Sequence, residues 1–220
     1  MIRGAIFDLD GTLLDSMEIW DTLGERYLRS IGYEPRECLG ETFKTFSTEQ
    51  AARYYQEHYG VALPIPRIVA GVNDMIRRFY QEEAQLKPGA EDFLRRLKNL
   101  GIRLCVATAN DGALARETLR RCGVLDCFSQ VFSCADLGVE GKGEPAIYRI
   151  ALAHLGTKKS ETAVFEDALH AVRTAKADGF VVAAVYDPYE PEQAALCALS
   201  DCYLTDYGHS EDFFALAQQK

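Results

Sequence analysis

The 220-residue chain lacks several features that mark membrane or secreted proteins. No apolar run approaches the ~20 residues that cross a bilayer, and its seven cysteines include no Cys-x-x-Cys pair. Scattered cysteines of this kind favour a reducing compartment over a disulfide framework or a zinc site. The first apolar run begins almost at Met1, so we expect no signal peptide and a cytoplasmic location.

Positive charge is also scarce, because 24 Lys and Arg residues face 33 Asp and Glu residues, for a net charge of −9. This balance argues against nucleic acid or an anionic membrane as a partner. An anionic substrate would require a metal and a few fixed donors that reverse the field locally. With 48% hydrophobic residues, the chain is long enough for one large domain or for a domain with a smaller insert.

Two patterns divide the chain. From Asp15 to about Leu86 the apolar spacing predicts helices and no strand, with capping-box patterns at residues 15–18 and 47–50. From Lys87 onward, helices alternate with the apolar runs IRLCVAT, QVFS, TAVFED, FVVAAVY and CYLT. With the first strand this makes about six strands, typical of a parallel sheet covered on both faces. We therefore predict an α/β fold, a doubly wound, mostly parallel Rossmann-like sheet from residues 1–15 and 87–220, with a helical domain of residues 16–86 inserted after the first strand.

Two carboxylates follow the first strand in the stretch AIFDLDGTLLDS. Carboxylates are rarely buried without a compensating charge. Residues two apart on a strand point to the same side, so Asp8 and Asp10 would share one small volume. Like charges at that distance resist joint ionisation unless a cation lies between them or one of them holds a proton. The pair therefore predicts a metal, a shared proton, or both.

Further polar residues follow other strands. Ligands of open α/β sheets bind beyond the carboxyl ends of the strands. Thr108 and Asn110 follow one strand, Glu166 and Asp167 follow another, and Lys142 precedes a helix. Oxygen ligands and few protein carboxylates suit Mg²⁺. An aspartate can attack phosphorus, and a threonine and a lysine can hold the transferring oxygens. The set indicates metal-assisted phosphoryl transfer.

The segments DLDGT, VATAN, GKGEPAIY and VFEDALHAVRTAKADG resemble, in this order, the four motifs of the haloacid dehalogenase superfamily. The helical insert resembles the small cap domain of its β-phosphoglucomutase-like branch. Two motifs depart from the usual pattern. Gly143 and Ala146 replace a proline and an aspartate in the third motif, and Ala168 and Ala171 replace a serine and a glycine in the fourth. No departure removes a charged group that the chemistry needs.

The resemblance implies a role for each site residue. Asp8 is the expected nucleophile and Asp10 the general acid/base. The expected Mg²⁺ site consists of Asp8, the backbone carbonyl of Asp10, and Asp167. The expected phosphate-binding residues are Thr108, Asn110 and Lys142, and the expected supporting residues are Gly11, Thr12 and Glu166.

We predict a Mg²⁺-dependent phosphatase that hydrolyses a small phosphorylated metabolite through an aspartyl-phosphate, as a monomer or weak dimer. The alternative is a phosphosugar mutase of the β-phosphoglucomutase type, which also uses both acids. Such mutases usually have a valine after D-x-D-G, a histidine early in the cap and an arginine in the cap loop. This chain has Thr12, Trp20 and no arginine in the loop TFSTEQ. A more remote alternative is a phospho-accepting regulatory protein without enzymatic activity.

Overall fold

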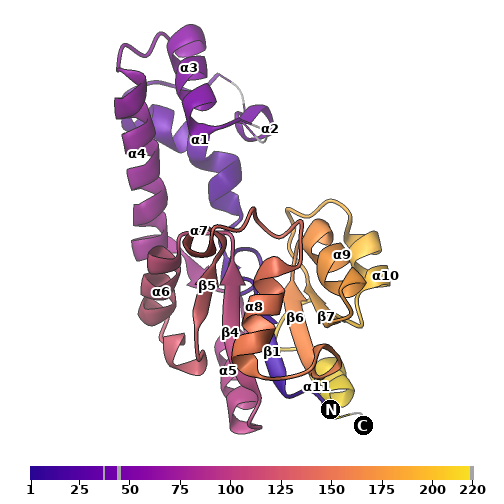
Figure 1. The fold of residues 1–220 in the computed structure, drawn as a ribbon. Helices are drawn as coiled ribbons and strands as arrows, with labels where there is room; N and C mark the ends of the chain where they lie inside the picture. Colours follow the sequence, from indigo (N-terminus) through magenta and orange to yellow (C-terminus); the bar gives the residue numbers. More distant parts are fainter. Residues whose placement is uncertain (37, 44–45, 219–220) are drawn as a thin grey trace. The chain divides into compact units, whose positions relative to one another are not determined.

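The computed structural model describes residues 1–36, 38–43 and 46–218, so Thr45 of the TFSTEQ loop lies outside the described residues. The chain divides into two compact units (Figure 1). Unit 1 consists of Met1–Asp15 and Gln85–Lys220, and unit 2 consists of Ser16–Ala84. Among the described residues, no helix is both long and apolar enough to cross a membrane.

Unit 1 is built on a six-stranded sheet with the strand order β5-β4-β1-β6-β7-β8. Every neighbouring pair in this sheet is parallel. The strands are β1 (Gly4–Phe7), β4 (Arg103–Thr108), β5 (Val131–Ser133), β6 (Thr162–Glu166), β7 (Val181–Val185) and β8 (Cys202–Leu204). The predicted doubly wound α/β class is confirmed, and the first strand lies at the centre of the sheet.

Helices cover both faces of the sheet (Figure 1). They are α5 (Ala90–Asn99), α6 (Gly112–Arg121), α7 (Cys134–Leu137), α8 (Ala146–Leu155), α9 (Leu169–Ala177), α10 (Gln193–Leu199) and α11 (Glu211–Gln218). Consecutive strand residues face opposite sides. Ile6 and Val164 pack among residues of α8, α9 and α10, whereas Phe7 stacks on Phe165, with ring centroids 4.2 Å apart, on the side of Phe93 of α5. The apolar strands are therefore buried on both faces.

Unit 2 contains α1 (Glu18–Ser30), α2 (Gly40–Phe43), α3 (Thr48–Tyr59) and α4 (Ile65–Arg78), followed by a π-helical turn over Phe79–Glu83. Its core is rich in tyrosine and aliphatic residues. The capping box predicted at residues 47–50 is present, and Gly60 ends α3 in the left-handed conformation, with φ 68°. The box predicted at residues 15–18 is wrong, because α1 starts after Met17 with no side-chain cap and Asp15 belongs to a strand.

Two short strands lie in unit 1 at the points where the chain leaves it for unit 2 and returns from it. β2 (Leu14–Asp15) pairs antiparallel with β3 (Gln85–Leu86), and the backbone N–H of Lys87 donates to the Leu13 carbonyl at 2.8 Å. The sequence pattern predicts no strand from Asp15 to about Leu86, and that prediction is wrong for Asp15, Gln85 and Leu86. A two-residue strand has too few positions to show an alternation of apolar and polar residues.

Asp178, just beyond α9, forms a largely buried ion-pair centre for two basic side chains. It accepts from Arg149 Nε at 3.0 Å and contacts Lys159 Nζ at 2.8 Å. These contacts, that with Arg149 foremost, lower the pKa of Asp178 from 3.8 to about 2. A folded-state pKa below the unfolded value means that the carboxylate stabilises the fold above about pH 4, and that this contribution is lost as the pH falls towards 2.

We therefore expect Asp178→Asn to lower the free energy of unfolding by about 1–2 kcal/mol at pH 7, a value reduced because the Arg149 side chain is 59% exposed. Urea unfolding of both proteins between pH 7 and pH 3 measures it. The difference between the two proteins should shrink towards pH 3. A difference that stays constant over this range would contradict the assignment.

Candidate active site

The residues of the predicted site lie at the carboxyl ends of three adjacent strands. Asp8 follows β1, Thr108 ends β4, and Glu166 ends β6. The backbone N–H of Asp8 donates to the Phe165 carbonyl at 3.0 Å, which continues the pairing of β1 with β6 as far as the first acid. Because β1 lies between β4 and β6, residues from three distant parts of the sequence come to one edge of the sheet.

Three carboxylates form a compact acidic cluster at this edge. Asp8, Glu166 and Asp167 each provide one oxygen, and these oxygens lie within 4.8 Å of one another. Lys142 Nζ contacts Asp8 Oδ1 and, at 2.8 Å, Glu166 Oε1. The Lys142 and Glu166 side chains are 6% and 1% exposed. One lysine cannot neutralise three ionised carboxylates, so the cluster would carry excess negative charge if all three were ionised.

The protonation of these groups reflects that excess. Burial raises the pKa of Asp167 well above its usual value, and the charges of Asp8 and Glu166 raise it further. Burial likewise raises the pKa of Glu166 to about 7, against the opposing effect of Lys142. Although burial alone would lower it, the carboxylates of Asp8 and Glu166 raise the pKa of Lys142. A further positive charge in the cluster would favour the ionised carboxylates.

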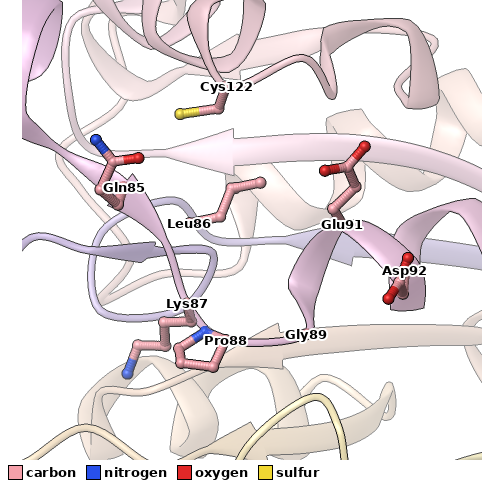
Figure 2. A pocket seen from close by; sticks show the side chains of 8 residues that line it. All are labelled: Gln85, Leu86, Lys87, Pro88, Gly89, Glu91, Asp92 and Cys122. Carbon is pink, nitrogen blue, oxygen red and sulfur yellow. The ribbon is translucent and has the colours of Figure 1, made fainter.

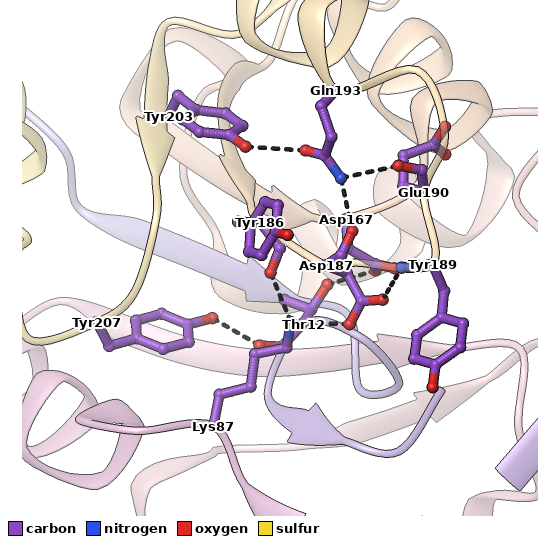
Figure 3. A network of polar contacts seen from close by, with 10 residues as sticks. All are labelled: Thr12, Lys87, Asp167, Tyr186, Asp187, Tyr189, Glu190, Gln193, Tyr203 and Tyr207. Carbon is purple, nitrogen blue, oxygen red and sulfur yellow. Dashed lines mark hydrogen bonds and ion pairs between the residues drawn. The ribbon is translucent and has the colours of Figure 1, made fainter. Parts of the chain in front are cut away.

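Thr12 links this cluster to the turn after β1, as Figure 3 shows. Its hydroxyl donates to Asp167 Oδ1 at 2.8 Å, and its carbonyl accepts from the hydroxyl of Tyr207 at 3.1 Å. Gly11, with φ 73°, makes the turn possible because a side chain is disfavoured at that angle. Thr12, one of the predicted supporting residues, therefore contacts Asp167 directly, and Gly11 shapes the turn that carries Thr12.

A buried ion pair lies in the same network (Figure 3). Lys87 Nζ contacts Asp187 Oδ2 at 2.8 Å and donates to the Tyr186 carbonyl at 2.6 Å. Because the backbone of Lys87 also binds Leu13, the turn that carries Thr12 is connected to the loop after β7. The sequence pattern predicts no role for Lys87 or Asp187.

Asp10 has a different environment from Asp8. Its Oδ2 accepts from Asn110 Nδ2 at 3.0 Å. Asn110 is itself held in place, because its backbone N–H donates to Thr108 Oγ1 at 3.0 Å and its carbonyl accepts from Ser133 Oγ at 2.7 Å. The two aspartates thus face different partners, an ammonium for Asp8 and an amide for Asp10. Different surroundings are what allow paired carboxyls to take different roles.

A pocket of about 420 Å³ lies elsewhere in unit 1, at the start of α5 (Figure 2). It is lined by Gln85, Leu86, Lys87, Pro88, Gly89, Glu91, Asp92 and Cys122. None of these lining residues belongs to the predicted site. The site is therefore defined by its converging polar groups and not by this pocket.

The departures from the fourth motif have a visible compensation. Ala168 precedes α9 and offers no side-chain cap, in the place where the usual motif has a serine. The carboxylate of Glu190 accepts from the backbone N–H of Leu169 at 3.0 Å instead. In the third motif, the Gly143 carbonyl accepts from Thr174 Oγ1 of α9 at 3.2 Å. The fourth motif is thus anchored by Glu190, which lies outside the motifs, and the third motif is anchored by Thr174 of the fourth.

Two tyrosines next to the site were not singled out by the sequence. Tyr207 binds the Thr12 carbonyl, and Tyr148 of α8 donates to Glu166 Oε1 at 2.6 Å. Both rings are buried. Helical spacing does place Tyr148 on the inner face of α8, and a buried tyrosine hydroxyl normally has a partner. Nothing in a single sequence names that partner.

Unit 1 is an open parallel α/β sheet, and such sheets bind ligands beyond the carboxyl ends of their strands. Carboxylates and a buried lysine at that edge are typical of enzymes that bind a phosphate or a metal there. The family model described as haloacid dehalogenase-like hydrolase matches residues 2–179. The chain belongs to this family. The predicted family is thereby confirmed, as is the prediction that the chain is an enzyme of the hydrolase type.

Individual proteins agree with this placement. The phosphorylated carbohydrates phosphatase of Thermotoga maritima is 26% identical over 178 residues, which cover 81% of this chain and 82% of the relative. The beta-phosphoglucomutase of Mycobacterium bovis is 29% identical over 217 residues, covering 82% and 79%. A solved Thermotoga maritima structure, with a provisional beta-phosphoglucomutase name, matches all of both chains with a TM-score of 0.85 and 24% identity. That last likeness concerns the fold.

The bond from Thr12 to Asp167 generates a prediction. Thr12→Val keeps the shape of the side chain and removes the donor, so Asp167 loses a contact that orients it. We expect hydrolysis of 4-nitrophenyl phosphate to slow about 10–100-fold, as when a partner of a metal-binding or catalytic group is removed. Thr12→Ser is the matched control, because it retains the hydroxyl and should stay near the wild-type rate. Equal rates for the valine and serine variants would contradict the role of the hydroxyl.

Proposed function

We propose that this enzyme is a Mg²⁺-dependent phosphatase that hydrolyses a small phosphorylated metabolite through an aspartyl-phosphate on Asp8. The observation that carries the proposal is the buried cluster of Asp8, Glu166 and Asp167 with Lys142 as its cationic partner. Buried acids in excess of buried bases suit a site that is completed by a cation and an anionic substrate.

The residues present fit a hard divalent cation. The cluster offers oxygen atoms, which Mg²⁺ prefers. In addition, Glu166 Oε2 is buried and has no hydrogen-bond partner among the described residues. We infer that Asp8, the backbone carbonyl of Asp10, and Asp167 hold the ion, with Glu166 beside them. When bound, Mg²⁺ supplies charge that neutralises phosphate oxygens and favours the ionised form of Asp8.

The protein's own groups account for the two transfers. A carboxylate oxygen of Asp8 forms a bond to phosphorus as the bond to the leaving oxygen breaks, and Asp10 gives its proton to that oxygen. Asp10 then takes a proton from the water that attacks the aspartyl-phosphate, which releases inorganic phosphate and restores Asp8. Asn110 orients the Asp10 carboxyl through its amide, and Thr108 and Lys142 hold the phosphoryl oxygens.

A phosphorylated sugar or polyol is the substrate class that we favour. Support comes from the names of the relatives, a phosphorylated carbohydrates phosphatase and a beta-phosphoglucomutase. We also propose that residues 16–86 serve as the cap domain, which would exclude bulk water during the transfer.

The first test is the release of inorganic phosphate from a panel of phosphorylated sugars, short phosphorylated acids and nucleotides, with Mg²⁺ and with excess chelator. We expect release from a few sugar or polyol phosphates, and loss of that release in chelator. Release that is equal with and without chelator would contradict the metal requirement. A folded enzyme that releases no phosphate from any compound would contradict the phosphatase.

Two substitutions test the division of roles between the aspartates. Asp8→Asn should abolish turnover, because a neutral amide cannot act as the nucleophile. Asp10→Asn should reduce the rate about 10²–10⁴-fold, the usual contribution of a general acid/base. Both variants should keep the wild-type circular dichroism spectrum, since the changes are nearly isosteric. A rate close to wild type in either variant is incompatible with this mechanism.

The mutase remains a second candidate because a relative over most of the chain is named beta-phosphoglucomutase. A mutase returns the phosphoryl group to another oxygen of the sugar instead of to water. Thr12, Trp20 and the absence of arginine from TFSTEQ favour hydrolysis. Incubation with β-glucose 1-phosphate separates the two functions, since isomerisation without phosphate release identifies the mutase.

A further inference from the structure

Tyr148 connects the hydrophobic core to the acidic cluster. Its side chain is fully buried on the inner face of α8, and its ring lies edge-on to Phe180 at 6.2 Å between centroids. Its hydroxyl donates to Glu166 Oε1 at 2.6 Å. The mechanism proposed above does not use Tyr148, so this bond from the core to an acid of the site requires another explanation.

The two carboxylate oxygens of Glu166 differ in their contacts. Oε1 accepts from Tyr148 and also from Lys142 Nζ at 2.8 Å. Oε2 is equally inaccessible to solvent, yet it has no hydrogen-bond partner in the described part of the chain. Each carboxylate oxygen has two lone pairs, so the two donors satisfy Oε1. An oxygen left unsatisfied in a buried site carries a desolvation cost unless a ligand completes its contacts.

Lys142 alone could not maintain this difference. With one donor, the carboxylate could turn about its last bond and present either oxygen to the ammonium, which would then compete with a cation for the group. The second donor comes from a fully buried side chain of α8 and binds the same oxygen as Lys142. Two donors on Oε1 make the arrangement asymmetric and keep Oε2 available.

We propose that Tyr148 is a positioning residue for the divalent cation: together with Lys142 it holds one oxygen of Glu166, so that the other is kept for the cation or for a water molecule bound to it. This inference rests on the metal site of the proposed function. It adds a residue outside the acidic cluster whose hydroxyl affects metal affinity without touching the metal.

The test measures metal binding directly, in the full-length protein and without substrate. Mn²⁺ is the probe, because it accepts the same oxygen ligands and its free concentration can be followed by electron paramagnetic resonance. Tyr148→Phe should raise the dissociation constant for Mn²⁺ about tenfold or more, the usual effect of removing a residue that orients a metal ligand. The phenylalanine ring of this variant still fills the core, so its melting temperature without metal should be close to that of the wild type, which verifies the fold.

Tyr203→Phe is the matched control. It removes a tyrosine hydroxyl of the same unit that donates to Gln193 Oε1 at 2.8 Å, outside the acidic cluster. We expect its Mn²⁺ affinity to remain within about twofold of wild type. An unchanged affinity in Tyr148→Phe, or an equal loss in both variants, would overturn the proposal.

A second variant makes the test independent of Tyr148. Glu166→Gln removes the negative charge and replaces one carboxylate oxygen by an amide –NH2, which cannot bind a cation, so it should weaken Mn²⁺ binding at least as much as Tyr148→Phe. Retained affinity in Glu166→Gln would also overturn the proposal. If the wild-type protein binds Mn²⁺ and both variants bind it more weakly as expected, but no phosphate ester is hydrolysed, the phosphatase is refuted and the positioning role of Tyr148 is supported. Metal-dependent hydrolysis with unaffected binding in Tyr148→Phe would refute the positioning role alone.

Discussion

The structure of the site depends on one electrostatic constraint: three carboxylates are held at the ends of two central strands, with a single buried lysine among them. Such a cluster is costly unless each charge has a partner. Lys142 forms ion pairs with Asp8 and Glu166, and Thr12 donates a hydrogen bond to Asp167. If all three carboxylates are ionised, these contacts do not neutralise the cluster, because it contains one ammonium group. A divalent cation would balance this surplus of negative charge and would allow the anionic phosphate of a substrate to approach, so the feature that is costly by itself is the one that suits the cluster to phosphoryl transfer.

The parts of unit 1 that hold these groups come from distant segments of the sequence. The strands β1 and β6 carry the acids, and the loop before α8 carries Lys142. Tyr207 binds the turn after β1, and Glu190 binds the backbone at the start of α9. Each of these two contacts is made to the backbone of a segment that carries a site residue, and neither is made to a reacting side chain. Precise positioning of this kind matters because small displacements of catalytic groups cost large factors in rate.

Much of this organisation can be predicted from the sequence because strong local signals agree with one another. Continuous apolar runs predict the buried strands, and the acids directly after them predict the site. The failures occur where the local signal is weak or misleading. Residues 15–18 match a capping box, but Asp15 pairs with Gln85 in a two-residue ladder. The sequence cannot show that pairing, because it joins residues seventy positions apart through backbone groups that every residue possesses.

By itself, the sequence determined the class of fold, the order of the motifs, and the acids and lysine that meet at the sheet edge, because strand ends in a parallel sheet converge whatever the details of packing. Only the tertiary structure decided which groups bind one another: Asp10 with Asn110, Thr12 with Tyr207, and Glu166 with both Lys142 and Tyr148. The physical reason is that a hydrogen bond is set by a few tenths of an ångström and by angle. Those quantities follow from how distant helices and strands pack, and residue spacing does not encode them.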